Sequence, residues 1–460
     1  MQLSRLAWNK KVHIGEFIMS ETVLSIAGFA TILIILFILN KKYVAPYIAI
    51  AGVPIITCLL IGHGANLNTY ITKGISSIST TGVMFIFSVM FFGVMSEAGA
   101  FDPFVTYIIK ATRGDPIRVM LGVFIFAAIV HLDGSGVVTC LLVIPPMFPI
   151  YKRLRMPNYL LALPLGLASG IMNAVPWGGP TLRAAVAINM DVMDLWIPFI
   201  PTQVFGLLVS AGIIYVLGRN EKKRMIADGR LVEGAAFNLD EFVPTLTEEQ
   251  IKMRRPKLLV INWIVIVVIL GIMMASLLAP VAAFMIGAGI AMIINYRDAQ
   301  IQRNLIEEKG KDAILMCSVI FAAGILMGVM GNSGMSAAMA NTMVSLLPSS
   351  MAKFMAPLIG VIAAPLSILF DPDSYYYGIM PIIAQVAETL GGSPVDIARA
   401  SIIGQMTLGW PLSPMVGTFF LFVGMCELDI GEWQKYAIKF IVPVGAAMTA
   451  FACVTGLFSF

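Results

Sequence analysis

The stretch that decides the fold runs from His131 to Asp191 and holds two polar interruptions, His131-Leu132-Asp133-Gly134-Ser135-Gly136 and Asn173-Ala174-Val175-Pro176-Trp177-Gly178-Gly179-Pro180-Thr181. Both lie within long apolar segments, so we expect them at membrane depth. Because lipid offers backbone groups no hydrogen-bond partners, unwound chain survives there only inside protein or beside a polar cavity. Interruptions of this kind indicate the binding site of a transporter.

Composition supports a membrane location. Hydrophobic residues make up 58% of the 460 residues and charged residues only 12%, and the mean hydropathy is +0.89. Soluble domains carry about 25% charged residues. Many apolar runs also approach the roughly 20 residues that a helix needs to cross a bilayer. The sequence therefore predicts an all-α polytopic membrane protein.

The chain is predicted to divide into two halves. Residues 1–21 form an extension, 22–218 the first half, 219–257 a polar cytoplasmic linker and 258–460 the second half. Each half is expected to hold about five spans, one of them broken, and a re-entrant hairpin. In the first half, the expected spans cover residues 22–39, 43–62, 81–98, 159–190 (broken near 176–180) and 197–218, and the hairpin covers 117–150 with its tip near 133–136. In the second half, the expected spans cover residues 258–279, 281–295, 313–330, 395–425 (broken near 409–414) and 436–457, and the hairpin covers 354–390 with its tip near 371–374.

Internal matches support a duplication. At one constant spacing they pair Asp133 with Asp371, Pro176 with Pro414 and Asp191 with Asp429.

The distribution of basic residues predicts that the two halves are inverted. Cytoplasmic loops near spans hold an excess of Lys and Arg. With the linker inside, most of the 30 basic residues fall in loops assigned to the cytoplasm. Outer regions then keep only Lys73, Lys353 and Arg399, apart from those of the extension. The first hairpin is therefore expected to begin and end on the cytoplasmic side, and the second on the outer side.

The first hairpin tip carries candidate ion-binding groups, Asp133 and Ser135, with His131 and Thr139 nearby. An Asp in the bilayer costs at least about 2.5–3.5 kcal/mol on insertion scales, so a role in binding or pairing is expected. Carboxylate and hydroxyl oxygens suit Mg²⁺ or Ca²⁺, and His131 is a candidate for proton exchange. The alternatives are that Asp133 only caps the next helix and that His131 is simply hydrogen-bonded.

The second tip, Asp371-Pro372-Asp373-Ser374-Tyr375-Tyr376-Tyr377, is more polar than the first. Asp373 and Ser374 are the expected ligand pair, and Asp373 joins Asp133 as a candidate metal ligand and carrier of protons or cations. Asp371 precedes a proline and is also explained by the shape of the turn. Tyr375 is a candidate substrate contact, although the three tyrosines also suit an aromatic belt at the membrane interface.

The broken spans suit a carboxylate substrate. Half-helix N-termini present free N–H groups and a positive dipole end, and Pro180-Thr181 is expected to open one of them. Arg183, a basic residue within the first broken span, either binds a substrate carboxylate or forms an internal ion pair, with Asp191 as the expected partner. The candidate substrate contacts are Asn173, Trp177, Gly179, Thr181 and Arg183 in the first broken span and Gln405, Ser413 and Thr418 in the second, which also contains Trp410.

Several functions have no support in the sequence. The five cysteines lie in or beside apolar runs and lack the spacing of a metal site or a disulfide framework. The patterns G-x-S-x-G, H-E-x-x-H and G-x-x-x-x-G-K-[ST] do not occur. We therefore expect no enzyme activity, no ATPase within the chain, no permanently bound cofactor and no nucleic-acid partner.

The quoted residues resemble a known family. The resemblance rests on four segments: His131-Leu132-Asp133-Gly134, Gly170-Ile171-Met172-Asn173, Pro176–Thr181 with Arg183, and Asp373-Ser374-Tyr375-Tyr376-Tyr377-Gly378. They look like the bacterial citrate–divalent-cation:proton symporters of the ion-transporter superfamily. The resemblance implies proton-driven uptake of citrate bound to Mg²⁺, Ca²⁺ or a related metal, across the bacterial cytoplasmic membrane. It also implies a homodimer whose hairpin-bearing transport domains move against a scaffold in an elevator mechanism.

The first tip departs from that family, whose tip usually reads Asp-Gly-Asp-Gly followed by threonines. Here it reads Asp133-Gly134-Ser135-Gly136-Val137-Val138-Thr139, and the missing oxygens weaken binding of a free divalent ion. The leading expectation is proton-coupled symport of citrate, or a similar hydroxycarboxylate, as its metal complex. Chelation removes charge before the substrate reaches a site of low dielectric constant. The alternatives are Na⁺-coupled uptake of a free di- or tricarboxylate and, without positive support, a channel or a membrane enzyme.

Overall fold

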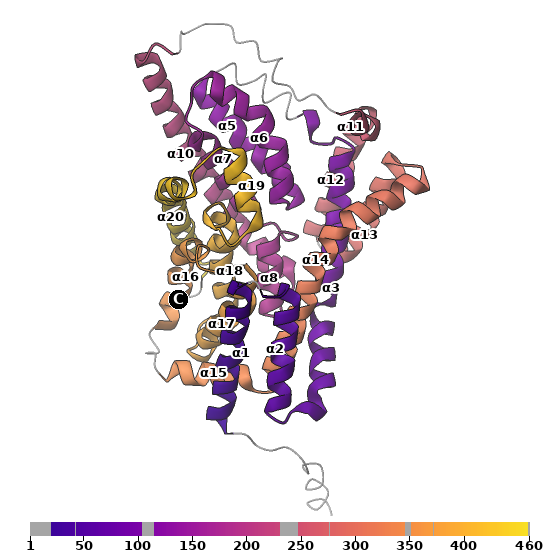
Figure 1. Ribbon diagram of the computed structural model, residues 1–460, viewed down its shortest axis with the longest axis vertical. Coiled ribbons are helices and arrows are strands. Elements are labelled where there is room, and N and C mark those ends of the chain that lie inside the picture. The colour runs from indigo at the N-terminus through magenta and orange to yellow at the C-terminus, as the bar shows by residue number, and fades with distance from the viewer. Residues whose placement is uncertain are drawn as a thin grey trace, which may run out of the picture.

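A computed structural model describes residues 20–41, 43–103, 115–230, 247–275, 277–345, 351–370 and 372–458, and the regular elements of these residues are helices (Figure 1). Asp371, residues 1–19 of the predicted extension and residues 231–246 of the linker lie outside the described residues. The helices of the first half are α1 (Glu21–Lys41), α2 (Pro46–Leu60), α3 (Leu67–Glu97), α5 (Pro116–Val130), α6 (Gly136–Arg153), α7 (Tyr159–Met172), α8 (Gly179–Ala187), α9 (Val192–Trp196) and α10 (Ile200–Ala227).

The second half begins after the linker. Helix α11 (Glu248–Met253) lies within the predicted linker, and the helices of the second half are α12 (Leu259–Met274), α13 (Pro280–Asn295), α14 (Ala299–Asn332), α15 (Met335–Val344), α16 (Ala352–Leu366), a π-helical segment (Ser374–Ile379), α17 (Met380–Thr389), α18 (Pro394–Ile403), α19 (Gly417–Met425) and α20 (Ile430–Val454). Within the described residues, seven helical stretches are long and apolar enough to cross a membrane, and four shorter apolar helices accompany them. The prediction of an all-helical polytopic membrane protein is thus confirmed.

Two expected spans are wrong in length. Residues 81–98 and 313–330 belong to α3 and α14, helices of 31 and 34 residues that begin 14 residues before each expected start. Both exceed the roughly 20 residues that cross a bilayer. The early part of α14 is charged, and its first turn is capped by Asp298, which accepts hydrogen bonds from the backbone of Gln300 and Ile301. The predicted start of α14 was therefore too late, because charged residues end an apolar membrane span without ending the helix.

The two halves share a local pattern around their second breaks. Helices α8 and α19 each contain nine residues. Each is followed by a residue with a left-handed backbone, Asn189 (φ 52°) and Glu427 (φ 50°). Asp191 and Asp429 then cap the next helices, α9 and α20, through their side chains. This parallel supports the predicted duplication, whereas the inversion of the halves and the predicted bounds of the parts remain predictions.

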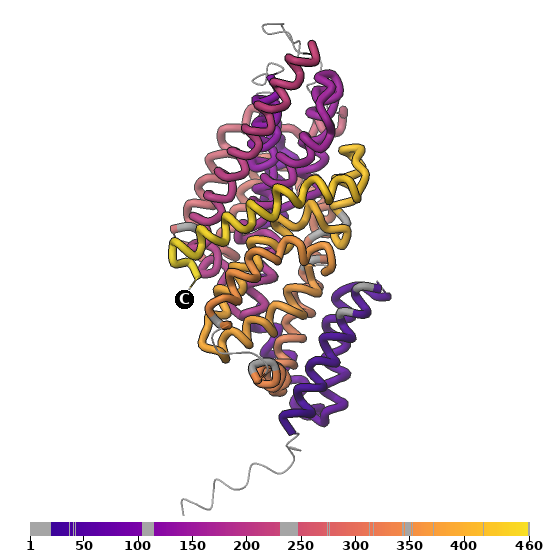
Figure 2. Tube along the Cα trace, turned by 90° about the vertical axis from the view of Figure 1, so that its left-hand side faces the viewer, coloured from indigo at the N-terminus to yellow at the C-terminus, as the bar shows by residue number. Residues whose placement is uncertain are grey.

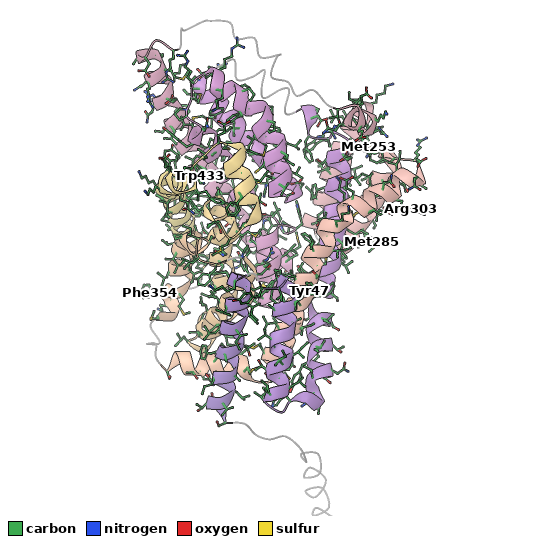
Figure 3. The ribbon with its side chains drawn as sticks, in the orientation of Figure 1. Tyr47, Met253, Met285, Arg303, Phe354 and Trp433 are labelled. Carbon is green, nitrogen blue, oxygen red and sulfur yellow. The ribbon has the colours of Figure 1, made fainter. Side chains whose placement is uncertain are left out.

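The helices form two groups. Helices α2, α3, α12, α13 and α14 contact one another, while α5, α7 and α10 and α16, α18 and α20 form the contacts of the other group. Figure 3 shows the first group on one side of the molecule, where Met253, Met285 and Arg303 lie, and Trp433 on the opposite side. Figure 2 shows α1 and α2 at the lower edge of the molecule, where α1 contacts α15 and α2 contacts α14. Helix α8 contacts α3 and α14 and so joins the two groups.

Glycines let α3 and α14 cross at close range. A Cβ on Gly328 would lie 2.9 Å from the Cα of Gly74 and would also meet the backbone oxygen of Tyr70. Backbone atoms cannot yield as a flexible side chain can, so the crossing depends on these small residues.

Gly328→Ala should therefore destabilise the protein by about 1–3 kcal/mol through overpacking of the helix crossing. The matched control is Gly331→Ala on the same helix, because a Cβ there meets no atom within 4 Å. Thermal unfolding of the two purified variants in detergent tests the prediction. Equal melting temperatures would contradict it.

Candidate functional site

The first hairpin tip is a short turn held by its own polar side chains. Residues His131–Asp133 form a 3₁₀ turn, Gly134 follows with φ 73°, and Ser135 caps α6 by accepting a hydrogen bond from Val138 N. Asp133 Oδ1 accepts a hydrogen bond of 2.8 Å from Ser135 N. Asp133 thus shapes the turn, and its predicted role in carrying protons or cations, like that of Ser135, remains a prediction.

The geometry around His131 defines its tautomer. Thr139 donates its hydroxyl proton to Ser135 O at 2.9 Å, and His131 Nδ1 lies 2.8 Å from the same hydroxyl. A hydroxyl has one proton, so Nδ1 is the donor in that contact and Nε2 of the neutral ring is an acceptor. Nε2 is buried and makes no contact of good hydrogen-bond geometry among the described residues, although the side chain of Asn173 lies close enough to interact with the ring.

The first broken span is interrupted between Met172 and Gly179, and its residues mostly satisfy one another. Thr181 Oγ1 donates to Ala174 O at 2.9 Å, and α8 starts at Gly179 with a proline in its first turn. Trp177 Nε1 donates to Leu132 O at 2.7 Å, which fastens this break to the first hairpin tip. The Trp177 ring stacks on Phe92 with centroids 5.2 Å apart.

The second broken span is interrupted more widely, between Ile403 and Gly417. Met406 has a left-handed backbone (φ 59°, ψ 6°), a strained conformation for a residue with a flexible side chain and no turn-forming group. Asn173 Nδ2 donates to Met406 O at 2.7 Å, so a residue of one break holds the strained residue of the other.

Gln405 and Ser413 are occupied by the second hairpin. Gln405 Oε1 accepts from Ser367 Oγ at 2.6 Å, and Gln405 Nε2 donates to Phe370 O at 3.2 Å. Ser413 donates to Ser367 O. In this structure these predicted substrate contacts hold protein groups together, and their role toward a substrate remains a prediction.

A small chamber lies where the first hairpin tip and both breaks meet. Its volume is about 80 Å³, and it is lined by Phe85, His131, Gly134, Gly136, Asn173, Gly179, Met406, Trp410, Val416 and Thr418. Trp410 Nε1 is buried and has no hydrogen-bond partner among the described residues. Two lining residues, His131 and Trp410, thus each carry a buried ring nitrogen without a hydrogen-bond partner among the described residues, and Asn173 and Thr418 are the other polar side chains of the lining.

The second hairpin tip contacts Arg183 and lies apart from that chamber. Arg183 Nε lies 2.7 Å from Asp373 Oδ1, and both side chains are buried. The expected pairing of Arg183 with Asp191 is wrong, because Asp191 accepts from Met193 N and caps α9. Among the described residues, none from the second tip lines the chamber.

The second tip is also more deeply buried than an aromatic belt would be. The relative exposures of Tyr375, Tyr376 and Tyr377 are 0%, 0% and 2%, so the alternative interpretation as a belt at the membrane interface is wrong. Ser374, another candidate substrate contact, is fully buried in the same π-helical segment. These rings form part of the packing between the second hairpin and its neighbours.

Three residues of the site were missed by the sequence analysis. Met406 was missed because a left-handed methionine has no sequence signal. Ser367 was missed because it lies in the arm of the hairpin and not in its polar tip. Tyr377 was grouped with its neighbours, although its hydroxyl has no hydrogen-bond partner among the described residues.

The metal-binding roles predicted for Asp133 and Asp373 remain predictions. No group of three or more His, Cys, Asp or Glu side chains that could hold an ion occurs within the described residues. Mg²⁺ and Ca²⁺ need six or more oxygen ligands, several of which water or substrate can supply. A bound divalent ion would therefore take most of its oxygen ligands from water or from the substrate.

Discontinuous helices that meet a hairpin tip at a polar chamber within an apolar bundle define the class of secondary membrane transporters. The sequence matches the family described as "Citrate transporter" over residues 17–404, and the chain belongs to that family. The family consists of transporters, so the expectation of no enzyme is confirmed.

Curated relatives cover the chain almost completely. A protein of Bacillus subtilis named "Mg(2+)/citrate complex secondary transporter" is 33% identical over 95% of this chain and 99% of its own length. Another, named "Citrate transporter" from the same organism, is 32% identical over 95% of this chain and 100% of its own length. Both are similar along the whole region that contains the hairpins and breaks.

Solved structures with the same fold are more distant. The Alcanivorax borkumensis YdaH transporter has a TM-score of 0.56 at 13% identity, over 85% of this chain and 89% of its own. Neisseria gonorrhoeae MtrF, described within a class of antimetabolite efflux pumps, has a TM-score of 0.58 at 15% identity, over 84% and 83% of the two chains. These likenesses concern the fold alone.

Proposed function

We propose that this protein is a proton-coupled symporter of citrate, or a similar hydroxycarboxylate, bound as its complex with Mg²⁺ or Ca²⁺. The observation that carries the proposal is the chamber with two unpartnered polar groups, Trp410 Nε1 and His131 Nε2. A buried polar group without a partner costs about 1–3 kcal/mol, so a folded protein retains two of them where a ligand supplies the missing bonds. Carboxylate oxygens accept from the indole N–H, and a substrate hydroxyl donates to the imidazole.

The absence of a cation inside the chamber favours a substrate of low charge. Among the described residues, none of those that line the chamber is Lys or Arg, and Arg183 is paired with Asp373. A bare citrate trianion would lose its hydration without receiving an opposite charge. Its metal complex enters with most of that charge already cancelled, as the name of the Mg²⁺/citrate relative suggests for that protein.

The transport mechanism that we propose is an elevator in a homodimer of the bacterial cytoplasmic membrane. The two helix groups of the fold are candidates for scaffold and transport domain, because the hairpin tip and both breaks belong to one of them. Light scattering of the purified protein in detergent tests the dimer.

Uptake into proteoliposomes tests the proposed function. With an inward proton gradient, we expect accumulation of citrate when Mg²⁺ or Ca²⁺ is present and its loss when EDTA removes the metal. A sodium gradient without a proton gradient should drive no uptake. Uptake that persists in EDTA and requires Na⁺ would overturn the proposal in favour of Na⁺-coupled transport of the free carboxylate.

A further inference from the structure

A cation lies one side chain away from the chamber at the breaks. Arg183 is 5% exposed and binds Asp373 through Nε, while its Nη1 lies 3.9 Å from Met406 Sδ. Met406 is one of the residues that line the chamber, and Arg183 is not. The side chain of Met406 therefore separates the chamber from one arm of the guanidinium group.

Met406 keeps this place in a strained conformation. Its φ of 59° and ψ of 6° are left-handed, and residues with a Cβ rarely adopt them. The other non-glycine residues with positive φ among the described ones, Arg155, Asn189 and Glu427, each follow the end of a helix, where a left-handed residue is common. Met406 instead lies inside the second break, so helix capping does not explain its backbone.

Hydrogen bonds from two other elements hold the backbone around Met406. Asn173 of the first break donates Nδ2 to Met406 O at 2.7 Å. Tyr376 of the second hairpin donates its hydroxyl to Gln405 O at 2.9 Å. These carbonyls belong to the two peptide groups that flank the Met406 Cα, so the bonds fix the direction in which its side chain leaves the backbone. Strain that the surrounding structure maintains in this way is typical of functional sites.

A thioether suits a partition between a charge and a binding chamber. Its sulfur is a weak acceptor, so it contacts the guanidinium without cancelling the charge, and its carbons present an apolar surface. Among the described residues, none of those that line the chamber is Lys, Arg, Asp or Glu. Without Met406, a substrate carboxylate in the chamber would face the guanidinium across a medium of low dielectric constant, where opposite charges attract strongly.

We infer that Met406 sets the charge selectivity of the chamber by screening it from Arg183, so that the chamber prefers the metal–carboxylate complex to the free carboxylate. This inference rests on the proposed function. It assigns Arg183 no direct contact with the substrate. It also explains why the strained backbone of Met406 is retained, since this conformation places the side chain between the guanidinium and the chamber.

Met406→Gly tests the inference, because glycine adopts φ 59° without strain and removes the side chain. Isothermal titration of the purified protein with Mg²⁺–citrate, and with citrate in EDTA, gives a dissociation constant for each form. We expect the Kd for metal-free citrate to fall by about tenfold or more relative to the Kd for the complex. Met406→Ala also removes the sulfur but keeps the left-handed strain, so it should shift the ratio of the two constants in the same direction.

Three further variants separate charge from volume and from backbone strain. In Met406→Gly/Arg183→Met/Asp373→Asn the larger chamber remains but both charges are gone, so the ratio should return to the wild-type value. Met406→Leu keeps an apolar side chain in front of the guanidinium and should also keep the wild-type ratio. Glu427→Gly relieves a left-handed backbone (φ 50°) at a residue that does not line the chamber, so it should leave the ratio unchanged.

An unchanged ratio in both Met406→Gly and Met406→Ala would overturn the inference. A shifted ratio that persists in the triple variant, or that appears equally in Met406→Leu, would overturn it too, because the guanidinium would then not be its cause. A wild-type protein that neither binds nor takes up Mg²⁺–citrate would instead refute the proposed function.

Discussion

Replacing Arg183 by methionine should reduce the free energy of unfolding by about 3–5 kcal/mol, because the carboxylate of Asp373 would remain buried without its counter-charge. Asp373→Asn should cost a similar amount by leaving the guanidinium unpaired. The double variant Arg183→Met/Asp373→Asn should regain most of the loss, since neither charge is then present. Unfolding of the purified variants in mixed micelles, followed by SDS titration, measures all three.

An exposed ion pair provides the control. Lys152 Nζ and Glu427 Oε2 lie 2.6 Å apart, with side chains 50% and 59% exposed. Such pairs contribute at most about 1 kcal/mol, so Lys152→Met should be nearly neutral. If Arg183→Met lowers the free energy of unfolding no more than Lys152→Met does, the predicted loss of about 3–5 kcal/mol for the buried pair is wrong.

Transport by the double variant separates the two interpretations of Arg183. If the pair only stabilises the fold, the stable double variant should transport at the wild-type rate. If Arg183 leaves Asp373 to bind a substrate carboxylate during transport, the double variant should be stable but inactive. We expect the first result, because Arg183 is paired with Asp373 and neither residue lines the chamber.

Local chemistry made the interruptions predictable from sequence. Glycine and proline that cluster with short polar residues favour a break in a helix, and the tip at Gly134 and the break before Gly179 agree with that rule. The hydrophobic length rule identified the helices that cross the membrane. Helix propensity and lipid exposure act on each segment by itself, so these features need no knowledge of the partner segments.

Long-range partners could not be predicted in the same way. Asp191 was the expected partner of Arg183, whereas the packing of α8 against the second hairpin brings Asp373 to it. The strained backbone of Met406 depends on the hydrogen bond from Asn173, a residue in the other half of the chain. The occupation of Gln405 by Ser367 likewise depends on how the hairpin lies against the break.

Asp133→Asn should abolish proton-driven accumulation of the substrate while exchange of substrate across the membrane continues. An amide oxygen can still accept the hydrogen bond from Ser135 N, so the turn is preserved. The amide cannot take up or release a proton, and it imitates the neutral form of the carboxyl group. A transporter fixed in that form can return with bound substrate but cannot couple the cycle to protons.

Three outcomes of this experiment have different meanings. Retained accumulation would show that Asp133 only shapes the turn and would leave His131 as the candidate proton carrier. Loss of both accumulation and exchange would indicate that the charge binds the substrate or its metal, since a neutral amide is a weaker ligand for a hard cation. Asp115→Asn is the control at the far end of the same hairpin arm, where Asp115 caps α5. Asp115→Asn removes an equal charge away from the chamber, so it should leave accumulation intact. Exchange that continues without accumulation in Asp133→Asn is the one outcome that identifies Asp133 as the proton carrier.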